Sequence, residues 1–209
     1  MNKKSYIEEL CVRYPELNPL KDKIKCAVDI MLMSYNSGGK ILICGNGGSA
    51  ADAEHISGEL LKGFILKRIP DEEDLERLSS VLGEDSKKLQ RGVPAIPLTS
   101  LSSVLSAYAN DVDPSLVFAQ LAYALGRQGD VLICISTSGN STNVVKAASA
   151  ARALGISTVA LTGEGGGKLG GICDITLNVP ATETYNVQEY HLPLYHAICA
   201  EIENVLFNK

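Results

Sequence analysis

The chain has 209 residues, of which 45% are hydrophobic and 21% are charged, and its formal net charge is −5. These values are typical of one globular domain and argue against an intrinsically disordered chain. No basic stripe offers a footprint for nucleic acid, and no apolar run reaches the roughly 20 residues of a membrane span, so both classes of partner are excluded.

The six cysteines are scattered and include no C-x-x-C pair. The first residues, MNKKSYIEELCVRYPEL, are charged and have no apolar signal core. Reduced thiols and the lack of a secretory signal are typical of a cytoplasmic protein, which is the localisation we expect.

Apolar residues at helical spacing predict a helical N-terminal segment over residues 1–37. KILIC then predicts a short buried strand, followed by a glycine loop and a helix over about residues 50–62. Residues 65–91 are highly charged, and we interpret them as a surface insertion with one short helix that begins near Pro70.

Beyond the insertion, apolar runs typical of strands alternate with helical patterns. The runs are VPAIPLT, DVLICIS, STVALTG and DITLNVP. This alternation predicts βαβ units, and therefore one α/β domain over residues 1–209 with a parallel sheet covered by helices on both faces. A final helix is predicted from Val187 to Phe207. Sheets of this kind bind ligands beyond the carboxyl ends of their strands, where the loops lie.

The loop after the first predicted strand reads GNGGS, from Gly45 to Ser49. Glycines there permit a positive φ and let a ligand approach the backbone, and the first amides of the next helix favour an anion. The spacing Gly45-x-Gly47-x-x-Ala50 also matches a dinucleotide fingerprint, although no acidic residue ends the following strand to bind a ribose. A tight strand-to-helix turn without a ligand is the remaining interpretation.

A second loop, ISTSGNSTN, carries four hydroxyl side chains within six residues: Ser136, Thr137, Ser138 and Ser141. Short hydroxyls beside exposed amides at a helix N-terminus can hold a phosphate without any lysine. Capping the helix would require only one of these hydroxyls. The loop therefore predicts a phosphate site, with a plain serine- and threonine-rich cap as the alternative.

All three histidines of the chain lie in two predicted helices. His55 and Glu59 are four residues apart and share a helix face, with Asp52 one turn earlier. Gln188 and His196 are eight residues apart and point to roughly the same side, with His191 between them. This set of residues fits a divalent metal ion, an acid–base pair, or two ordinary surface faces, and the residue types alone do not choose among them.

Four stretches together resemble the sedoheptulose 7-phosphate isomerases, or phosphoheptose isomerases, of the sugar isomerase (SIS) domain superfamily. They are GNGGSAADAEH, ISTSGNSTNVVKA, ALTGEGGGKL and VQEYHLPLYHAIC. The resemblance covers nearly the whole chain apart from about residues 65–91. It implies a flavodoxin-like SIS domain with a five-stranded parallel sheet flanked by helices. It also implies a homotetramer that uses the N-terminal helix for assembly and builds its active sites between subunits.

The resemblance implies an intramolecular oxidoreductase of the sugar-phosphate isomerase type. Such an enzyme interconverts sedoheptulose 7-phosphate and D-glycero-D-manno-heptose 7-phosphate through an enediol. A carboxylate must then take a carbon-bound proton, and a second group must protonate or polarise the carbonyl oxygen. The matching positions are Glu59 as the general base and His196 as the general acid.

The resemblance also assigns ligands to the remaining positions. Ser136, Thr137, Ser138 and Ser141 would hold the phosphate. The other substrate contacts would be Asn46, Gly47, Ser49, Asp111 and Gln188. In zinc-containing members the ion is bound at the positions of His55, Glu59, Gln188 and His196, which implies one zinc per subunit.

Two positions depart from the family pattern. Tyr185 stands where an aspartate is common, three residues before Gln188, and Pro193 interrupts the last helix, so it either kinks that helix or marks its true start. A non-catalytic SIS regulator, similar to the tetrameric relative that binds the bacterial replication initiator, is the alternative function. The presence of His55, Glu59, Gln188 and His196 favours the enzyme.

Overall fold

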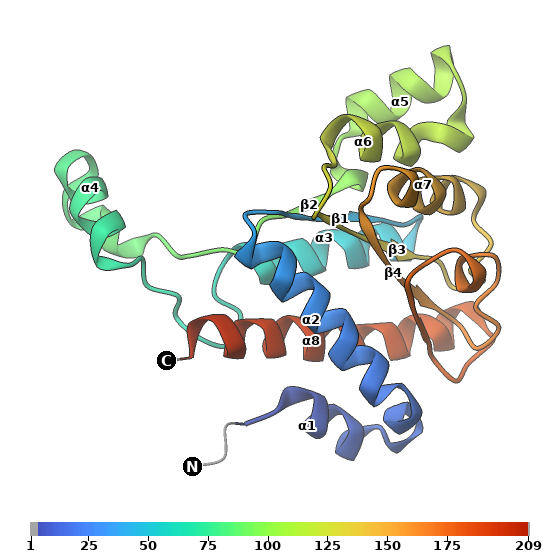
Figure 1. Ribbon diagram of the computed structural model, residues 1–209, viewed down its shortest axis with the longest axis horizontal. Coiled ribbons are helices and arrows are strands. Elements are labelled where there is room, and N and C mark those ends of the chain that lie inside the picture. The colour runs from blue at the N-terminus through green and yellow to red at the C-terminus, as the bar shows by residue number, and fades with distance from the viewer. Residues whose placement is uncertain (1–3, 209) are drawn as a thin grey trace.

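The computed structural model describes residues 4–208. Its centre is one all-parallel sheet of five strands in the order β2-β1-β3-β4-β5, shown in Figure 1. The strands are β1 (Ile41–Cys44), β2 (Ala95–Pro97), β3 (Val131–Ile135), β4 (Ser157–Thr162) and β5 (Ile175–Asn178). The predicted α/β fold is confirmed.

The middle of the sheet is buried on both faces, which explains the continuous apolar runs in the sequence. Every residue of β1 and β3 is buried, and the two strands pair in register from Ile41 beside Val131 to Cys44 beside Cys134. The chain leaves β1 toward β2 and later returns to β3 on the other side. This reversal of strand order is a topological switch point, and folds of this kind bind ligands beyond the carboxyl ends of the strands there, β1 and β3.

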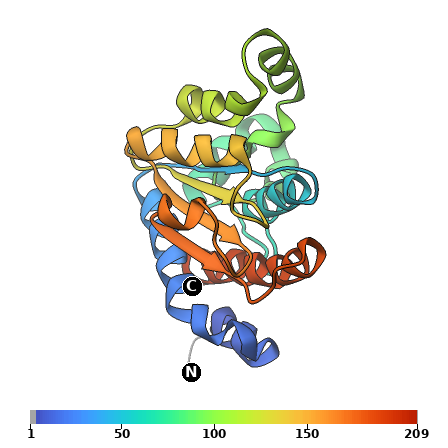
Figure 2. The ribbon, with the colours of Figure 1, turned by 90° about the vertical axis from the view of Figure 1, so that its right-hand side faces the viewer.

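Helices cover both faces of the sheet, as Figure 2 shows. One core joins the sheet to α1 (Tyr6–Arg13), α2 (Lys21–Asn36), α3 (Gly48–Leu61) and α8 (Thr184–Phe207). The other core joins it to α5 (Ser102–Asp111), α6 (Val117–Leu125) and α7 (Thr142–Ala153). Short 3-10 turns connect these elements: η1 (Pro15–Leu20), η3 (Leu98–Ser100), η4 (Pro114–Leu116) and η5 (Leu169–Gly171).

The N-terminal segment is helical but divided. Residues 1–3 of the predicted segment lie outside the described residues. In the rest, α1 ends at Arg13, Tyr14 leaves the helical region with φ of −131° and ψ of 78°, and a 3-10 turn separates α1 from α2. Pro15 explains the break, because proline has no backbone N–H with which to continue a helix.

The charged insertion forms an arm that extends away from the sheet (Figure 1). Its helix α4 (Glu72–Leu82) begins at the predicted place, with the Asp71 side chain accepting a hydrogen bond from the Asp74 amide, and η2 (Gly83–Lys88) follows. None of the residues in α4 is buried. The arm is attached at its base by a buried ion pair between Arg68 and Glu203 of α8.

No helix within residues 4–208 is long and apolar enough to cross a bilayer.

Candidate active site

Two loops meet at the carboxyl edge of the sheet, after β1 and β3. A reciprocal pair of side-chain amides joins them: Asn46 Nδ2 donates to Asn143 Oδ1, and Asn143 Nδ2 donates to Asn46 Oδ1, both at 2.9 Å. Gly47, at the start of α3, has a φ of 56°, a value that favours glycine. The role of Asn143 could not be foreseen, because its partner is 97 residues away in the sequence.

The second loop places the predicted hydroxyl residues just before and at the start of α7. Ser141 is the N-cap residue of α7, yet its side chain makes no capping hydrogen bond, and its Oγ lies 3.0 Å from the Oγ of the buried Ser136. Thr137 is half-buried and Ser138 is exposed. A helix N-terminus whose cap hydroxyl does not bond the helix amides, beside three further hydroxyl residues, is suited to a phosphate.

Helices α3 and α8 bring together the predicted catalytic side chains. His55 Nε2 lies 3.2 Å from Glu59 Oε1 and 3.4 Å from His196 Nε2. Lys62 Nζ lies 3.6 Å from the other Glu59 oxygen. Burial, followed by the neighbouring His55, lowers the pKa of His196 below its ordinary value, while Glu59 opposes this effect. The neutral imidazole is therefore favoured, and a neutral histidine can still polarise a carbonyl oxygen through its ring N–H.

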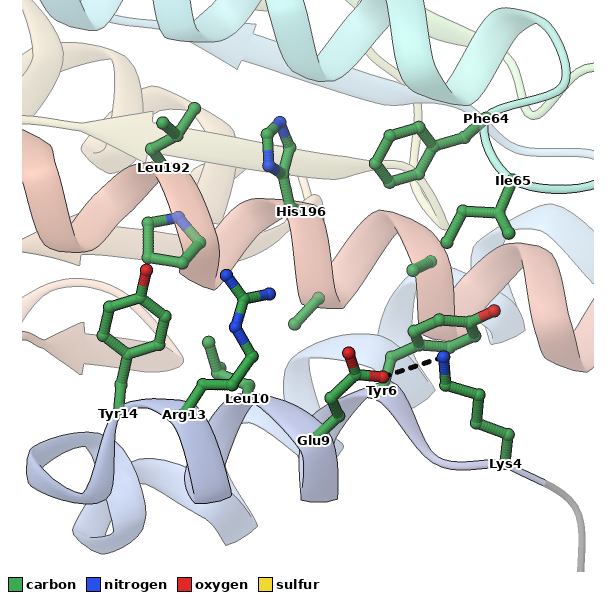
Figure 3. Close-up of a pocket in the computed structure, with 13 residues that line it drawn as sticks. Lys4, Tyr6, Glu9, Leu10, Arg13, Tyr14, Phe64, Ile65, Leu192 and His196 are labelled. Carbon is green, nitrogen blue, oxygen red and sulfur yellow. Dashed lines mark ion pairs between the residues drawn. The ribbon is translucent and has the colours of Figure 1, made fainter.

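His196 also borders a cavity of about 360 Å³ between α1, α8 and the loop at Phe64. Figure 3 shows the imidazole at one edge of this cavity, with Arg13 of α1 on the opposite side. The Phe64 ring centroid lies 5.5 Å from that of His196, and an ion pair between Lys4 and Glu9 (2.8 Å) lines the wall beyond. The imidazole thus separates the catalytic cluster from an open space.

Gln188 lies at the other end of the same helix face. A Cβ atom on Gly48 would overlap Gln188 Nε2, so the Gln188 amide lies against the first turn of α3. The helix α8 runs without a break from Thr184 to Phe207 and includes Pro193, so the expectation that Pro193 marks its start is wrong. Eight residues of helix between Gln188 and His196 correspond to about 12 Å along the helix axis, so the two side chains must lean toward each other to reach one ligand.

Tyr195 is a site residue that the sequence analysis missed. Its hydroxyl lies 2.9 Å from His55 Nδ1 and 3.2 Å from Asp52 Oδ1, and its ring is buried. Burial raises the pKa of Asp52, and the hydrogen bond from Tyr195 counteracts part of that rise. The only signal in the sequence was that Asp52 lies one turn before His55, since the tyrosine comes from a helix 140 residues later.

His191 does not belong to this cluster. It is fully buried, and both of its ring nitrogens lack a hydrogen-bond partner within the described residues. Burial lowers its pKa to about 4, and the nearby Thr162 backbone opposes this only in part. His191 is therefore a neutral core residue, although it lies between Gln188 and His196 in the sequence.

The depressed pKa of His191 predicts acid sensitivity. Because the unfolded chain takes up this proton near pH 6.5 and the folded chain only near pH 4, stability is complete above pH 6.5 and falls between these values. We expect His191 to lower the free energy of unfolding by about 2–3 kcal/mol over this pH range, and His191→Leu to abolish that decrease. Urea unfolding of the wild type and of His191→Leu from pH 7 to pH 4 measures this decrease. If the free energies of unfolding of the two proteins changed in parallel with pH, the prediction would be wrong.

The chain matches the model of the SIS domain family over residues 5–91 and 90–163. It is 43% identical to a phosphoheptose isomerase of Aliarcobacter butzleri over 190 residues, which are 91% of this chain and 89% of the relative. The chain belongs to the phosphoheptose isomerase family. These relatives are named as isomerases, which agrees with the predicted sugar-phosphate isomerase class, whereas the oxidoreductase label finds no support in them.

Two solved phosphoheptose isomerases share the fold. The structure from Neisseria gonorrhoeae is 36% identical with a TM-score of 0.74, and the match covers 94% of both chains. The structure from Francisella tularensis is 32% identical with a TM-score of 0.77, and the match covers 94% of this chain and 91% of that one. The flavodoxin-like SIS domain implied by the sequence resemblance is thereby confirmed.

The four residues implied as zinc ligands fit zinc in part. The separations of His55 Nε2 from Glu59 Oε1 and His196 Nε2, 3.2 and 3.4 Å, are close to the roughly 3.3 Å between donors of a tetrahedral zinc ion. Within residues 4–208, however, no group of three or more His, Cys, Asp or Glu side chains is arranged so that it could hold a metal ion. The donor atoms and the spacing of His55 from Glu59 and His196 suit zinc. A complete set of four ligands requires these side chains to rearrange.

Asp111 lies apart from the other predicted site residues. It ends α5, a helix that packs on the opposite face of the sheet from α8, and its carboxylate accepts a hydrogen bond from Asn110 Nδ2 at 2.8 Å. Its assignment to the substrate stays a prediction, as do those of Asn46, Gly47 and Ser49.

Proposed function

We propose that this protein is a phosphoheptose isomerase that interconverts sedoheptulose 7-phosphate and D-glycero-D-manno-heptose 7-phosphate. The observation that carries the proposal is the convergence of Glu59 and His196 on His55, in a chain of this family. A ketose–aldose isomerisation moves a proton between C1 and C2 through an enediol, and it needs one carboxylate base and one acid.

In this mechanism Glu59 takes the carbon-bound proton. Its carboxylate is mostly buried, with His55 Nε2 at 3.2 Å from one oxygen and Lys62 Nζ at 3.6 Å from the other. His196 protonates or polarises the carbonyl oxygen of the substrate, and since burial lowers its pKa, the neutral ring would act through its N–H.

The phosphate end of the substrate binds in the hydroxyl loop, on Ser136, Thr137, Ser138 and Ser141. Gln188, whose amide lies against the first turn of α3, contacts the sugar between the two ends. Strong binding of the remote phosphate orients the short reacting end against Glu59 and His196. We assign the other sugar contacts to Asn46, Gly47, Ser49 and Asp111. The Asn46 amide keeps one N–H and one lone pair beyond its pair with Asn143.

We also infer that each subunit binds one zinc ion through His55, Glu59, Gln188 and His196. When bound, zinc acts as a Lewis acid on the carbonyl and hydroxyl oxygens of the substrate.

The purified protein is expected to carry, or to take up, about one zinc per subunit on the strength of this four-ligand set. Metal analysis by mass spectrometry, before and after dialysis against a chelator, measures the content. His191→Leu keeps all four ligands and should match the wild type. No bound metal, together with activity that chelators leave unchanged, would refute the zinc assignment.

A homotetramer with active sites between subunits is part of the same proposal. The cavity beside His196 lies between α1 and α8, where a neighbouring subunit could reach the site. Light scattering on the eluting protein measures the mass of the assembly.

An assay of sedoheptulose 7-phosphate conversion, with and without added zinc, tests the function. Conversion supports the isomerase. An intact tetramer that converts nothing under either condition would overturn the proposal in favour of a non-catalytic SIS regulator.

A further inference from the structure

The Tyr195 hydroxyl is placed between two polar groups of α3. Its oxygen lies 2.9 Å from His55 Nδ1 and 3.2 Å from Asp52 Oδ1, and the aromatic ring is 2% exposed. The second carboxylate oxygen, Asp52 Oδ2, is buried and has no hydrogen-bond partner within the described residues. Asp52 therefore depends on Tyr195 for its hydrogen bonding.

The number of protons at this contact determines the form of the histidine. A tyrosine hydroxyl has one proton to donate, and an ionised carboxylate can only accept. When Tyr195 donates to Asp52, its oxygen has only lone pairs left for His55. The short contact with Nδ1 is then a hydrogen bond only if Nδ1 carries the ring proton and donates it to Tyr195.

A neutral histidine with its proton on Nδ1 has a lone pair on Nε2. In His55 that lone pair points toward Glu59 Oε1 at 3.2 Å and His196 Nε2 at 3.4 Å. A lone pair and a carboxylate repel each other unless a proton or a cation lies between them. The arrangement thus suits a proton donated by His196 or a bound metal ion.

We propose that Tyr195, held by Asp52, is a positioning residue that fixes His55 with its proton on Nδ1 and its Nε2 lone pair directed at Glu59 and His196. The use of that lone pair rests on the proposed function, but the tautomer itself does not. Metal-binding histidines usually donate their second nitrogen directly to a carboxylate or a carbonyl. In this protein a tyrosine hydroxyl stands between the imidazole and the carboxylate.

Nitrogen NMR of the histidine rings tests the proposal on the full-length, metal-free protein without substrate, at a pH where the rings are neutral. The chain has only three histidines, and the loss of one signal in His55→Gln identifies His55. The expected result is that His55 carries its proton on Nδ1 in the wild type. A proton on Nε2 there would overturn the proposal.

Two variants should move that proton by different routes. Tyr195→Phe keeps the ring but removes the acceptor at Nδ1, and Asp52→Ala frees the Tyr195 hydroxyl to donate to Nδ1. Both are expected to shift His55 to the form protonated on Nε2, whereas Tyr190→Phe, on the same helix, should leave it unchanged. A His55 that keeps its Nδ1 proton in either site variant would overturn the proposal.

A second readout separates this role from a general loss of structure. Tyr195→Phe should lower kcat for sedoheptulose 7-phosphate with little change in KM, because the phosphate loop is untouched, and its circular dichroism should match the wild type. A raised KM with unchanged kcat would count against positioning. If the wild type shows no isomerase activity, the proposed function fails while the NMR result still decides the tautomer.

Discussion

Replacing Glu59 by glutamine is expected to lower the turnover of sedoheptulose 7-phosphate by about 10²–10⁴-fold, the usual contribution of a general base. Glutamine has nearly the same shape as glutamate, so its contacts with His55 and Lys62 can largely persist. The amide cannot accept a proton from carbon, however. Because the loss falls on proton transfer and not on phosphate binding, kcat should fall much more than KM rises.

The matched control is Glu54→Gln on the same helix. Glu54 is exposed and accepts a hydrogen bond from Ser100 Oγ at 3.0 Å, away from His55 and His196. This variant should keep turnover close to the wild type. Both variants should elute with the wild-type mass and melt at similar temperatures. Turnover by Glu59→Gln within a few-fold of the wild type would remove Glu59 from the role of base.

The sheet was predictable because its signals are local. Each buried parallel strand reads as a short apolar run, and KILIC and DVLICIS became β1 and β3, the two fully buried strands. The loops after them follow from the same reasoning, since parallel strands bring their carboxyl ends to one edge. The division of the N-terminal segment at Tyr14 was missed because the helical periodicity continues on both sides of Pro15.

The site was predictable only where its residues share a helix face. His55 and Glu59, four apart, could be paired from spacing alone. Spacing also placed His191 near Gln188 and His196, yet that side chain turns into the core and meets no polar partner. Tyr195 and Asn143 were not found, because each is defined by a partner on another element, and only the tertiary fold brings the two together.

The buried ion pair at the base of the arm leads to the largest expected effect on stability. Both side chains are at most 1% exposed, and Arg68 Nε donates to Glu203 Oε1 at 2.7 Å. Glu203 also accepts hydrogen bonds from the backbone amides of Phe64, Ile65 and Leu66. The guanidinium of Arg68 in turn donates to the Glu59 and Leu60 carbonyls at the end of α3.

Arg68→Met is therefore expected to lower the free energy of unfolding by about 3–5 kcal/mol, because it leaves the Glu203 carboxylate buried without a charge partner. The same substitution at Arg77, which pairs with Glu73 on the exposed α4, should cost no more than about 1 kcal/mol. Urea unfolding of both variants at one protein concentration measures the contrast. Equal losses of unfolding free energy in the two variants would mean that the Arg68–Glu203 pair does not hold the arm. A large loss for Arg68→Met, with reduced kcat in the protein that remains folded, would show that the attachment of the arm also holds the end of α3 that carries Glu59.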